Sequence, residues 1–301
     1  MNTDEPRRPN PRAGPRPGWG RDEARSVISA PSAASGGVPE PSAEYLAQAA
    51  LDSKRLEQAQ PMLIVVDLNG TILHRPHGVK RPKIFVHRPH AFAFLDYMVK
   101  NFWVVVWSSA RPDNVKYMCR MLLPTQTLDN VVAVWDRSHF GLTQKDYNSR
   151  TQCYKRLTKL WDNPDVARSH PQYSTGGRWS QANTVLIDDS IEKARSEPYN
   201  AITVPEFDDT PDLYDMILPQ VHDYIHELCY QSDVSAYIRV KPFEPVTDQD
   251  SKKTPPKSSA TLYARKHKKR AKAKARKEAK KVRQGEEPKE SGQQAQHDQA
   301  H

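Results

Sequence analysis

The residues with the clearest chemical potential are Asp67-Leu68-Asn69-Gly70-Thr71, which directly follow the apolar run Met62–Val66. A buried strand that ends in this glycine-containing turn would place the Asp67 carboxylate at the carboxyl end of a sheet, where open parallel α/β sheets bind their ligands. A carboxylate in that place can attack an electrophile or bind a metal ion. Asn69 is an amide and cannot carry a proton, so Asp67 lacks an acid/base partner at this spacing.

Polar side chains also follow two further apolar runs. They are Ser108 and Ser109 after residues 102–107, and Asp188 and Asp189 after residues 184–187. One aspartate after a strand is more often a turn or helix cap than a catalyst. The carboxyl ends of neighbouring parallel strands meet at one edge of a sheet, so three such groups together favour a functional site.

The elements that must position these side chains alternate between strands and helices. Strands are predicted at residues 62–66, 102–107, 131–135, 184–187 and 201–204. Helices are predicted at residues 42–57, 91–100, 112–122, 153–161 and 212–231, the last interrupted near Pro219. Short β-branched runs bounded by helical patterns predict an α/β fold, with a parallel sheet, right-handed crossovers and helices on both faces.

The composition predicts one folded domain between disordered arms. The chain has 301 residues, 37% apolar residues and a mean hydropathy of −0.80, and eight of its 25 prolines fall in the first 41 residues. Such a segment buries too little apolar surface to fold by itself. The predicted divisions are a disordered arm at 1–41, a leading helix at 42–60, the domain at 61–231, a linker at 232–250 and a disordered basic tail at 251–301.

The charge of +9 is concentrated at the C-terminal end. Residues 251–301 hold sixteen Lys or Arg and five Asp or Glu, which leaves 29 basic and 31 acidic side chains before them. Such a tail can serve nuclear import, or contact nucleic acid or an acidic protein. No apolar run reaches the roughly 18 to 20 residues that span a bilayer, so no membrane insertion is expected. The three scattered cysteines fit a reducing compartment.

The motifs together resemble a known family. Asp67-Leu68-Asn69-Gly70-Thr71 resembles the D-x-D-x-T signature of the haloacid dehalogenase (HAD) superfamily. The other landmarks resemble its NLI-interacting-factor-like branch with FCP1 homology, small phosphatases that act on the C-terminal domain of RNA polymerase. These landmarks are Arg88-Pro89, Trp107-Ser108-Ser109-Ala110, Lys155-Arg156-Leu157-Thr158-Lys159-Leu160 and Ile187-Asp188-Asp189-Ser190. The resemblance runs from about Pro61 to Leu228, and it implies a HAD-like Rossmannoid sheet with a small flap and no large cap domain.

The resemblance also implies a role for each residue at the strand ends. Asp67 would attack phosphorus and form an aspartyl-phosphate, with Thr71 completing the catalytic signature. Ser108, Ser109 and Gly70 would contact the phosphate, and Lys155 would neutralise it and the nucleophile; Lys159 is a competing candidate. Mg²⁺ would be held by Asp67, the Asn69 backbone carbonyl, Asp189 and, in support, Asp188.

In the family a second aspartate acts as acid and base where this chain has Asn69, so three functions stay open. The protein could be a slow Ser/Thr phosphoprotein phosphatase, a pseudophosphatase that binds phosphopeptides or proteins, or a structural relic. Among nearby histidines, one of His74, His77, His87 and His90 could substitute as the acid. A further class is a nucleic-acid-associated protein that acts through its tail. The short loops favour a phosphorylated protein or peptide as partner, and a monomer in the nucleus or cytoplasm is expected, the nucleus being favoured by the tail.

Overall fold

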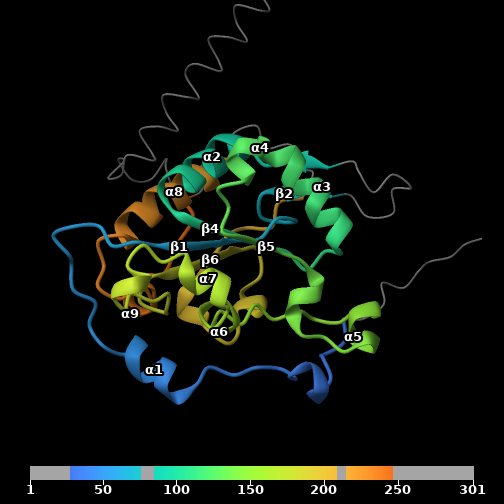
Figure 1. Ribbon diagram of the computed structural model, residues 1–301, viewed down its shortest axis with the longest axis horizontal. Helices are drawn as coiled ribbons and strands as arrows, with labels where there is room; N and C mark the ends of the chain where they lie inside the picture. Colours follow the sequence, from blue (N-terminus) through green and yellow to red (C-terminus); the bar gives the residue numbers. More distant parts are fainter. Residues whose placement is uncertain (1–27, 76–84, 209–214, 247–301) are drawn as a thin grey trace, which may run out of the picture.

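The computed structural model describes residues 28–75, 85–208 and 215–246. Its centre is a five-stranded sheet in the order β5-β4-β1-β6-β7 (Figure 1). The strands are β1 (Leu63–Val66), β4 (Trp103–Trp107), β5 (Ala133–Trp135), β6 (Thr184–Asp188) and β7 (Ala201–Thr203). All neighbouring pairs in this sheet are parallel. The predicted α/β fold with a parallel sheet is therefore confirmed.

Strand β1 lies at the middle of the sheet and is buried on both faces. Ile64 and Val66 pack into one apolar cluster, and Leu63 and Val65 into another. None of the four side chains is exposed, and burying each contributes about 1.5 to 3 kcal/mol. An uninterrupted run of apolar residues is what a parallel strand with helices on both faces requires.

Helices cover the two faces of the sheet. One face carries α2 (Ala91–Asn101), α3 (Pro112–Leu122), α4 (Thr125–Leu128) and α8 (Ile217–Leu228), and the other α6 (Thr158–Trp161) and α7 (Pro164–Arg168) (Figure 1). In α2 the side chains of Phe94, Leu95 and Met98 are buried at helical spacing. Helix α3 begins with Pro112 as predicted, because a helix needs no N–H at that position.

A small flap follows β1. It consists of β2 (Leu73–His74) and β3 (Val86–His87), which pair antiparallel, and residues 76–84 between them lie outside the described residues. Between β5 and β6 the chain forms only short helices, including α5 (Gln144–Asn148), and no large cap is present in the described residues. Across those same residues, no helix has the length and apolar character to cross a membrane.

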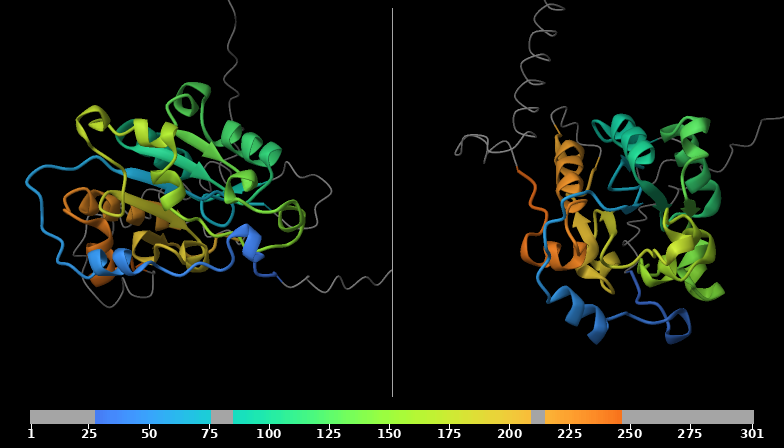
Figure 2. Two further views of the ribbon diagram at one scale, coloured as in Figure 1. Left: turned by 60° about the horizontal axis from the view of Figure 1, so that its bottom comes forward. Right: turned by 60° about the vertical axis from the view of Figure 1, so that its left-hand side comes forward.

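Residues 28–41 lie against the domain, so the predicted disorder is wrong for this part of the arm. The buried Asp146 carboxylate accepts hydrogen bonds from the Ser32 N–H at 2.9 Å, the Ser32 hydroxyl at 2.6 Å and the Ser35 hydroxyl at 2.5 Å. Figure 2 shows this blue segment along the outside of the domain. The segment has little apolar surface to bury, and these hydrogen bonds to the Asp146 carboxylate hold it against the domain instead. Residues 1–27 and the predicted tail at 251–301 lie outside the described residues.

Three predicted boundaries change. The leading helix at 42–60 is only α1 (Ala43–Ala49), although Ser42 caps it by accepting from the Tyr45 N–H at 3.1 Å. The helix predicted at 153–161 is reduced to α6, so Lys155 lies before it. The linker predicted at 232–250 contains α9 (Val234–Val240), whose Val234 and Ile238 are buried and fasten it to the domain.

Candidate active site

The carboxyl ends of three adjacent strands bring the predicted site residues together. Asp67 follows β1, Ser108 follows β4, and Asp188 is the last residue of β6. The Asp67 N–H donates to the Ile187 carbonyl at 3.0 Å, and the Ser108 N–H donates to the Trp135 carbonyl at 3.0 Å. These sheet bonds fix the backbone from which the side chains project.

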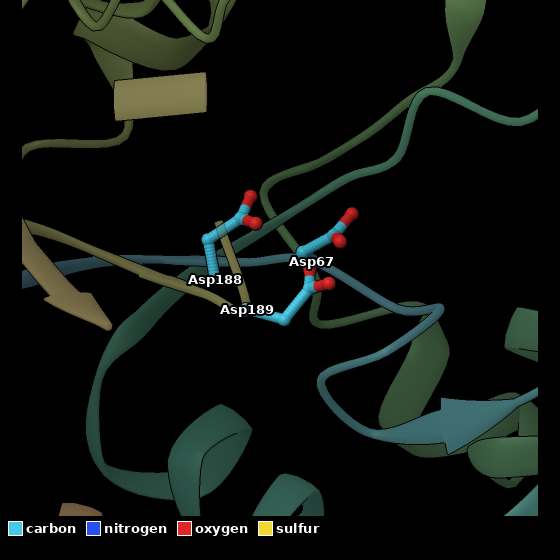
Figure 3. Close-up of side chains that lie close together, drawn as sticks. All are labelled: Asp67, Asp188 and Asp189. Carbon is cyan, nitrogen blue, oxygen red and sulfur yellow. The ribbon is translucent and has the colours of Figure 1, made fainter. Parts of the chain in front are cut away.

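Three carboxylates gather at this edge. Asp67, Asp188 and Asp189 each offer an oxygen, and these oxygens lie within 4.8 Å of one another (Figure 3). Asp67 and Asp188 are only 2% and 1% exposed, so their charges need partners within the protein. Hard divalent ions such as Mg²⁺ prefer carboxylate oxygens. The donor set therefore fits a divalent metal ion, and both Asp188 and Asp189 belong to it.

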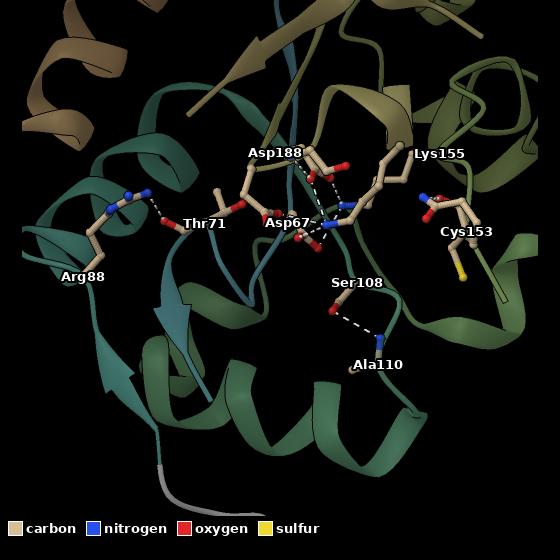
Figure 4. Close-up of polar contacts among 12 residues, drawn as sticks. Asp67, Thr71, Arg88, Ser108, Ala110, Cys153, Lys155 and Asp188 are labelled. Atoms are coloured by element: carbon tan, nitrogen blue, oxygen red, sulfur yellow. Dashed lines mark hydrogen bonds and ion pairs between the residues drawn. The ribbon is translucent and has the colours of Figure 1, made fainter. Parts of the chain in front are cut away.

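Lys155 is the predicted counter-charge and makes two close contacts. Its Nζ lies 2.8 Å from Asp67 Oδ1 and 2.6 Å from Asp188 Oδ2 (Figure 4), and its side chain has no exposed surface. The competing candidate Lys159 instead donates to the Phe140 carbonyl at 2.9 Å. Lys155 is thus the lysine of this motif that neutralises Asp67.

A second lysine, Lys193, was missed by the sequence analysis. It lies on the 3₁₀ turn Ile191–Ala194 after β6, and its Nζ lies 3.0 Å from Asp67 Oδ2, 2.9 Å from Asp188 Oδ1 and 2.9 Å from Asp189 Oδ1. Burial acts to lower the pKa of Lys193, but the surrounding carboxylates outweigh it and raise this pKa well above its usual value. Lys193 is therefore a cation held by all three carboxylates.

The loop after Asp67 contains a glycine that no other residue could replace without strain. Gly70 has φ +88°, in the left-handed region, and a Cβ at this position would lie 2.5 Å from Asp189 Oδ2. Its N–H donates to the Leu73 carbonyl at 2.8 Å, which closes the turn. Gly70 thus allows the loop after Asp67 to approach the Asp189 carboxylate closely.

The remaining predicted residues lie around this cluster. The Asn69 Oδ1 accepts from the Arg75 N–H at 2.9 Å. Thr71 is fully buried, and its hydroxyl has no hydrogen-bond partner among the described residues. Ser108 is 2% exposed, and its hydroxyl oxygen accepts from the Ala110 N–H at 3.4 Å (Figure 4). Ser109 is half-buried at the same strand end.

Arg88, from the Arg-Pro element, joins the loop after Asp67 to a segment far away in the sequence. Its guanidinium donates to the Thr71 carbonyl at 2.7 Å and to the Pro205 carbonyl at 2.5 Å, and pairs with Asp215 at 2.8 Å. The Arg88 side chain is 2% exposed. Arg88 contacts the backbone of the loop and therefore holds the loop in place without contacting the carboxylate cluster.

The histidines considered as substitute acids have other environments. Burial lowers the pKa of His87, and its ring packs 4.5 Å from the Phe92 ring. His90 takes a left-handed conformation, φ 70°, at the start of α2. His74 pairs within the flap, and His77 lies outside the described residues. The Asp67 ion pairs of the described residues come from lysines alone.

Sequence comparisons identify relatives of this chain. A model of the NLI interacting factor-like phosphatases matches residues 62–235. An uncharacterised FCP1 homology domain-containing protein of Schizosaccharomyces pombe is 32% identical over 224 residues, which cover 70% of this chain and 88% of that protein. A putative CTD phosphatase-like protein of Invertebrate iridescent virus 3 is 27% identical over 166 residues, or 53% of this chain and 75% of that protein.

Two solved structures are more distant. One is the fission yeast RNA polymerase II CTD phosphatase Fcp1 bound to beryllium fluoride, and the other is Fcp1, an essential RNA polymerase II CTD phosphatase. Both are 15% identical, with TM-scores of 0.31 and 0.32 and coverage of 65% and 67% of this chain. The matches cover 47% and 56% of those two chains, so this chain spans about half their length. The family match over more than half of the sequence shows that this chain belongs to the NLI interacting factor-like phosphatases of the HAD superfamily.

Proposed function

We propose that this protein is a magnesium-dependent Ser/Thr phosphoprotein phosphatase that uses Asp67 as its nucleophile. The observation that carries the proposal is the position of Asp67, a buried carboxylate at a strand end with Lys155 at 2.8 Å and two further aspartates beside it. Phosphoryl transfer needs an in-line nucleophile, a hard cation and donors around the phosphate oxygens. The strand ends hold a carboxylate for attack, further carboxylates that could bind a metal ion, and Lys155 and Ser108 as donors.

Asp67 would form a bond to phosphorus while the bond from phosphorus to the substrate oxygen breaks, and the departing oxygen would take its proton from water, because the Asn69 amide is not an acid. Lys155 holds the Asp67 carboxylate in place and reduces its repulsion of the incoming phosphate. Ser108 would donate a hydrogen bond from its hydroxyl to a phosphate oxygen, since among the described residues that hydroxyl accepts a long bond from the Ala110 N–H and has no acceptor for its own proton. Water would then hydrolyse the aspartyl-phosphate and restore Asp67.

Asp67, Asp188 and Asp189, together with the Asn69 backbone carbonyl, would hold Mg²⁺. The close approach of Gly70 to Asp189 supports this choice, because it keeps the nucleophile loop against the carboxylate. When bound, Mg²⁺ would polarise a phosphoryl oxygen and neutralise developing negative charge.

The proposed substrate is a phosphorylated segment of a protein. Only short helices and loops join β5 to β6 in the described residues, so no large cap among them would enclose a small metabolite, which favours a peptide. The viral relative is called a putative CTD phosphatase-like protein, which supports a phosphorylated protein segment as substrate class. The basic residues 251–301 support a nuclear location and contact with nucleic acid or an acidic protein.

A second candidate is a binding module without turnover, and Asn69 is the observation that favours it. An amide cannot protonate the departing oxygen, and its Oδ1 already accepts from the Arg75 N–H. A protein with this site could bind phosphopeptides through Lys155 and Ser108 and release them unchanged.

Hydrolysis of an aryl phosphate and a phosphoserine peptide by the full chain separates the two candidates. A phosphatase would show turnover that requires Mg²⁺, disappears in Asp67→Asn and persists in the control Asp165→Asn, which changes an exposed carboxylate away from the cluster. Phosphopeptide binding without turnover by the wild type would instead establish the binding module. Turnover retained in Asp67→Asn would contradict the assignment of the nucleophile.

A further inference from the structure

The ammonium of Lys193 occupies the centre of the carboxylate cluster. It lies 2.9 to 3.0 Å from one oxygen of Asp67, Asp188 and Asp189, the same three side chains whose oxygens could hold a metal ion. Lys155 contacts only two of them. Lys193 and a divalent ion would therefore use the same three carboxylates.

The charges at this edge do not allow both cations to keep the same contacts. Three carboxylates face two ammonium groups, which leaves one net negative charge. A divalent ion bound to the three carboxylates would lie beside the Lys193 ammonium, and like charges repel strongly at contact distance in a partly buried site. One of the two cations must give up its place.

Lys193 can move away, whereas Lys155 cannot. The Lys193 side chain is 16% exposed and has a path to solvent, while that of Lys155 has no exposed surface. The Lys193 backbone is fixed, because its carbonyl accepts from the Lys155 N–H at 2.7 Å and its N–H donates to the Ser190 carbonyl at 3.1 Å. The movement would therefore be a rotation of the flexible four-carbon side chain.

We propose that Lys193 is an exchangeable counter-ion of the carboxylate cluster. It neutralises Asp67, Asp188 and Asp189 in the metal-free protein and is displaced when a divalent cation binds, so it lowers the apparent affinity for that cation. The inference rests on the metal-binding part of the proposed function and not on turnover. It means that Lys193 raises the metal concentration at which the site is half-occupied.

Mn²⁺ binding to the full chain tests the exchange, with free Mn²⁺ counted by electron paramagnetic resonance. Lys193→Met should bind Mn²⁺ about tenfold more tightly or better, a gain of about 1.4 kcal/mol, because no ammonium has to be displaced. Lys193→Arg keeps the charge and should stay much closer to wild type. The matched control is Lys159→Met, since Lys159 is also partly buried but bonds to a carbonyl and not to the cluster.

A second measurement uses the wild-type protein alone, in case Lys193→Met does not fold without metal. Brief treatment with an amine-reactive reagent, followed by mass spectrometry, reports how accessible each lysine is. Adding Mn²⁺ should increase labelling of Lys193 several-fold, while the enclosed Lys155 stays unlabelled.

Mn²⁺ binding and lysine labelling together decide whether Lys193 is displaced. Tighter Mn²⁺ binding by Lys193→Met supports the exchange, and so does binding by this variant when the wild type shows none. Equal or weaker binding by Lys193→Met, or unchanged Lys193 labelling in wild type that binds Mn²⁺, overturns it while the metal site stands. No Mn²⁺ binding by any variant overturns it and also removes the metal ion from the proposed function.

Discussion

Replacing Asn69 by aspartate should raise the rate of phosphate ester hydrolysis without disturbing the site. The Asn69 Oδ1 accepts from the Arg75 N–H at 2.9 Å, and an aspartate of the same shape can accept the same bond. Its second oxygen is then free to carry the proton that the departing oxygen requires. The substitution therefore tests one chemical group in an unchanged loop.

The expected gain depends on the leaving group. General acid/base catalysis contributes about 10²- to 10⁴-fold, which corresponds to about 2.7 to 5.5 kcal/mol of the barrier. A serine alkoxide is a poor leaving group and should show the full gain. A phenol with a pKa of about 10 leaves more readily as an anion. The rate of aryl phosphate hydrolysis should therefore rise clearly less.

Steady-state hydrolysis of both substrates by wild type, Asn69→Asp and the double variant Asp67→Asn/Asn69→Asp measures these effects. The double variant should be inactive, because the acid cannot replace the nucleophile. Equal gains for both substrates would show that position 69 does not protonate the leaving group. Activity in the double variant would place the chemistry elsewhere and refute the reasoning.

Three further perturbations have defined outcomes. Lys155→Met leaves buried carboxylates with one ammonium fewer, and should lower the free energy of unfolding by about 3 to 5 kcal/mol in urea titrations of metal-free protein. Gly70→Ala should lower the free energy of unfolding by about 1 to 2 kcal/mol because of the left-handed conformation, and should weaken Mn²⁺ binding by displacing Asp189. The control is Gly37→Ala, where φ is +56° and an added Cβ would meet open space. This control should lose stability without a change in Mn²⁺ binding. Hydrogen bonds from Ser32 and Ser35 lower the pKa of Asp146 to about 2. The contribution of Asp146 to folding stability is therefore present above its unfolded pKa of about 3.9 and is lost as the pH falls towards 2. The difference in urea stability between wild type and Asp146→Asn should shrink over that range, and a constant difference would contradict the assignment.

The strand ends could be predicted from the sequence because their signals are local. Residues 62–66 are apolar without interruption and end at Asp67, and the same pattern precedes Ser108 and Asp188. Parallel pairing then brings these ends together whatever the details of the helices. Each of these patterns spans only a few residues, and the parallel pairing of β1 with β6 brings the carboxylates together.

Lys193 and the N-terminal bonds could not be predicted in this way. Ile191–Ala194 has the composition of an ordinary exposed turn, and its lysine reaches the site only because β6 lies next to β1. Asp146 and Ser32 are 114 residues apart, so neither one indicates the other. The helix predicted around Lys155 does not extend that far, because the Lys155 N–H donates to the Lys193 carbonyl instead of forming a helical bond.

The contacts of the N-terminal segment define where the working unit of this protein begins. Arg156 follows Lys155 directly and donates to the Gly36 and Gly37 carbonyls at 2.6 and 2.9 Å. Arg195, two residues after Lys193, donates to the Pro39 carbonyl at 3.0 Å. A protein trimmed to residues 62–235, the part that the family model matches, would lose these N-terminal contacts of both arginines, which lie beside its two site lysines. The smallest unit suited to enzymology therefore includes the N-terminal segment from residue 28 onwards.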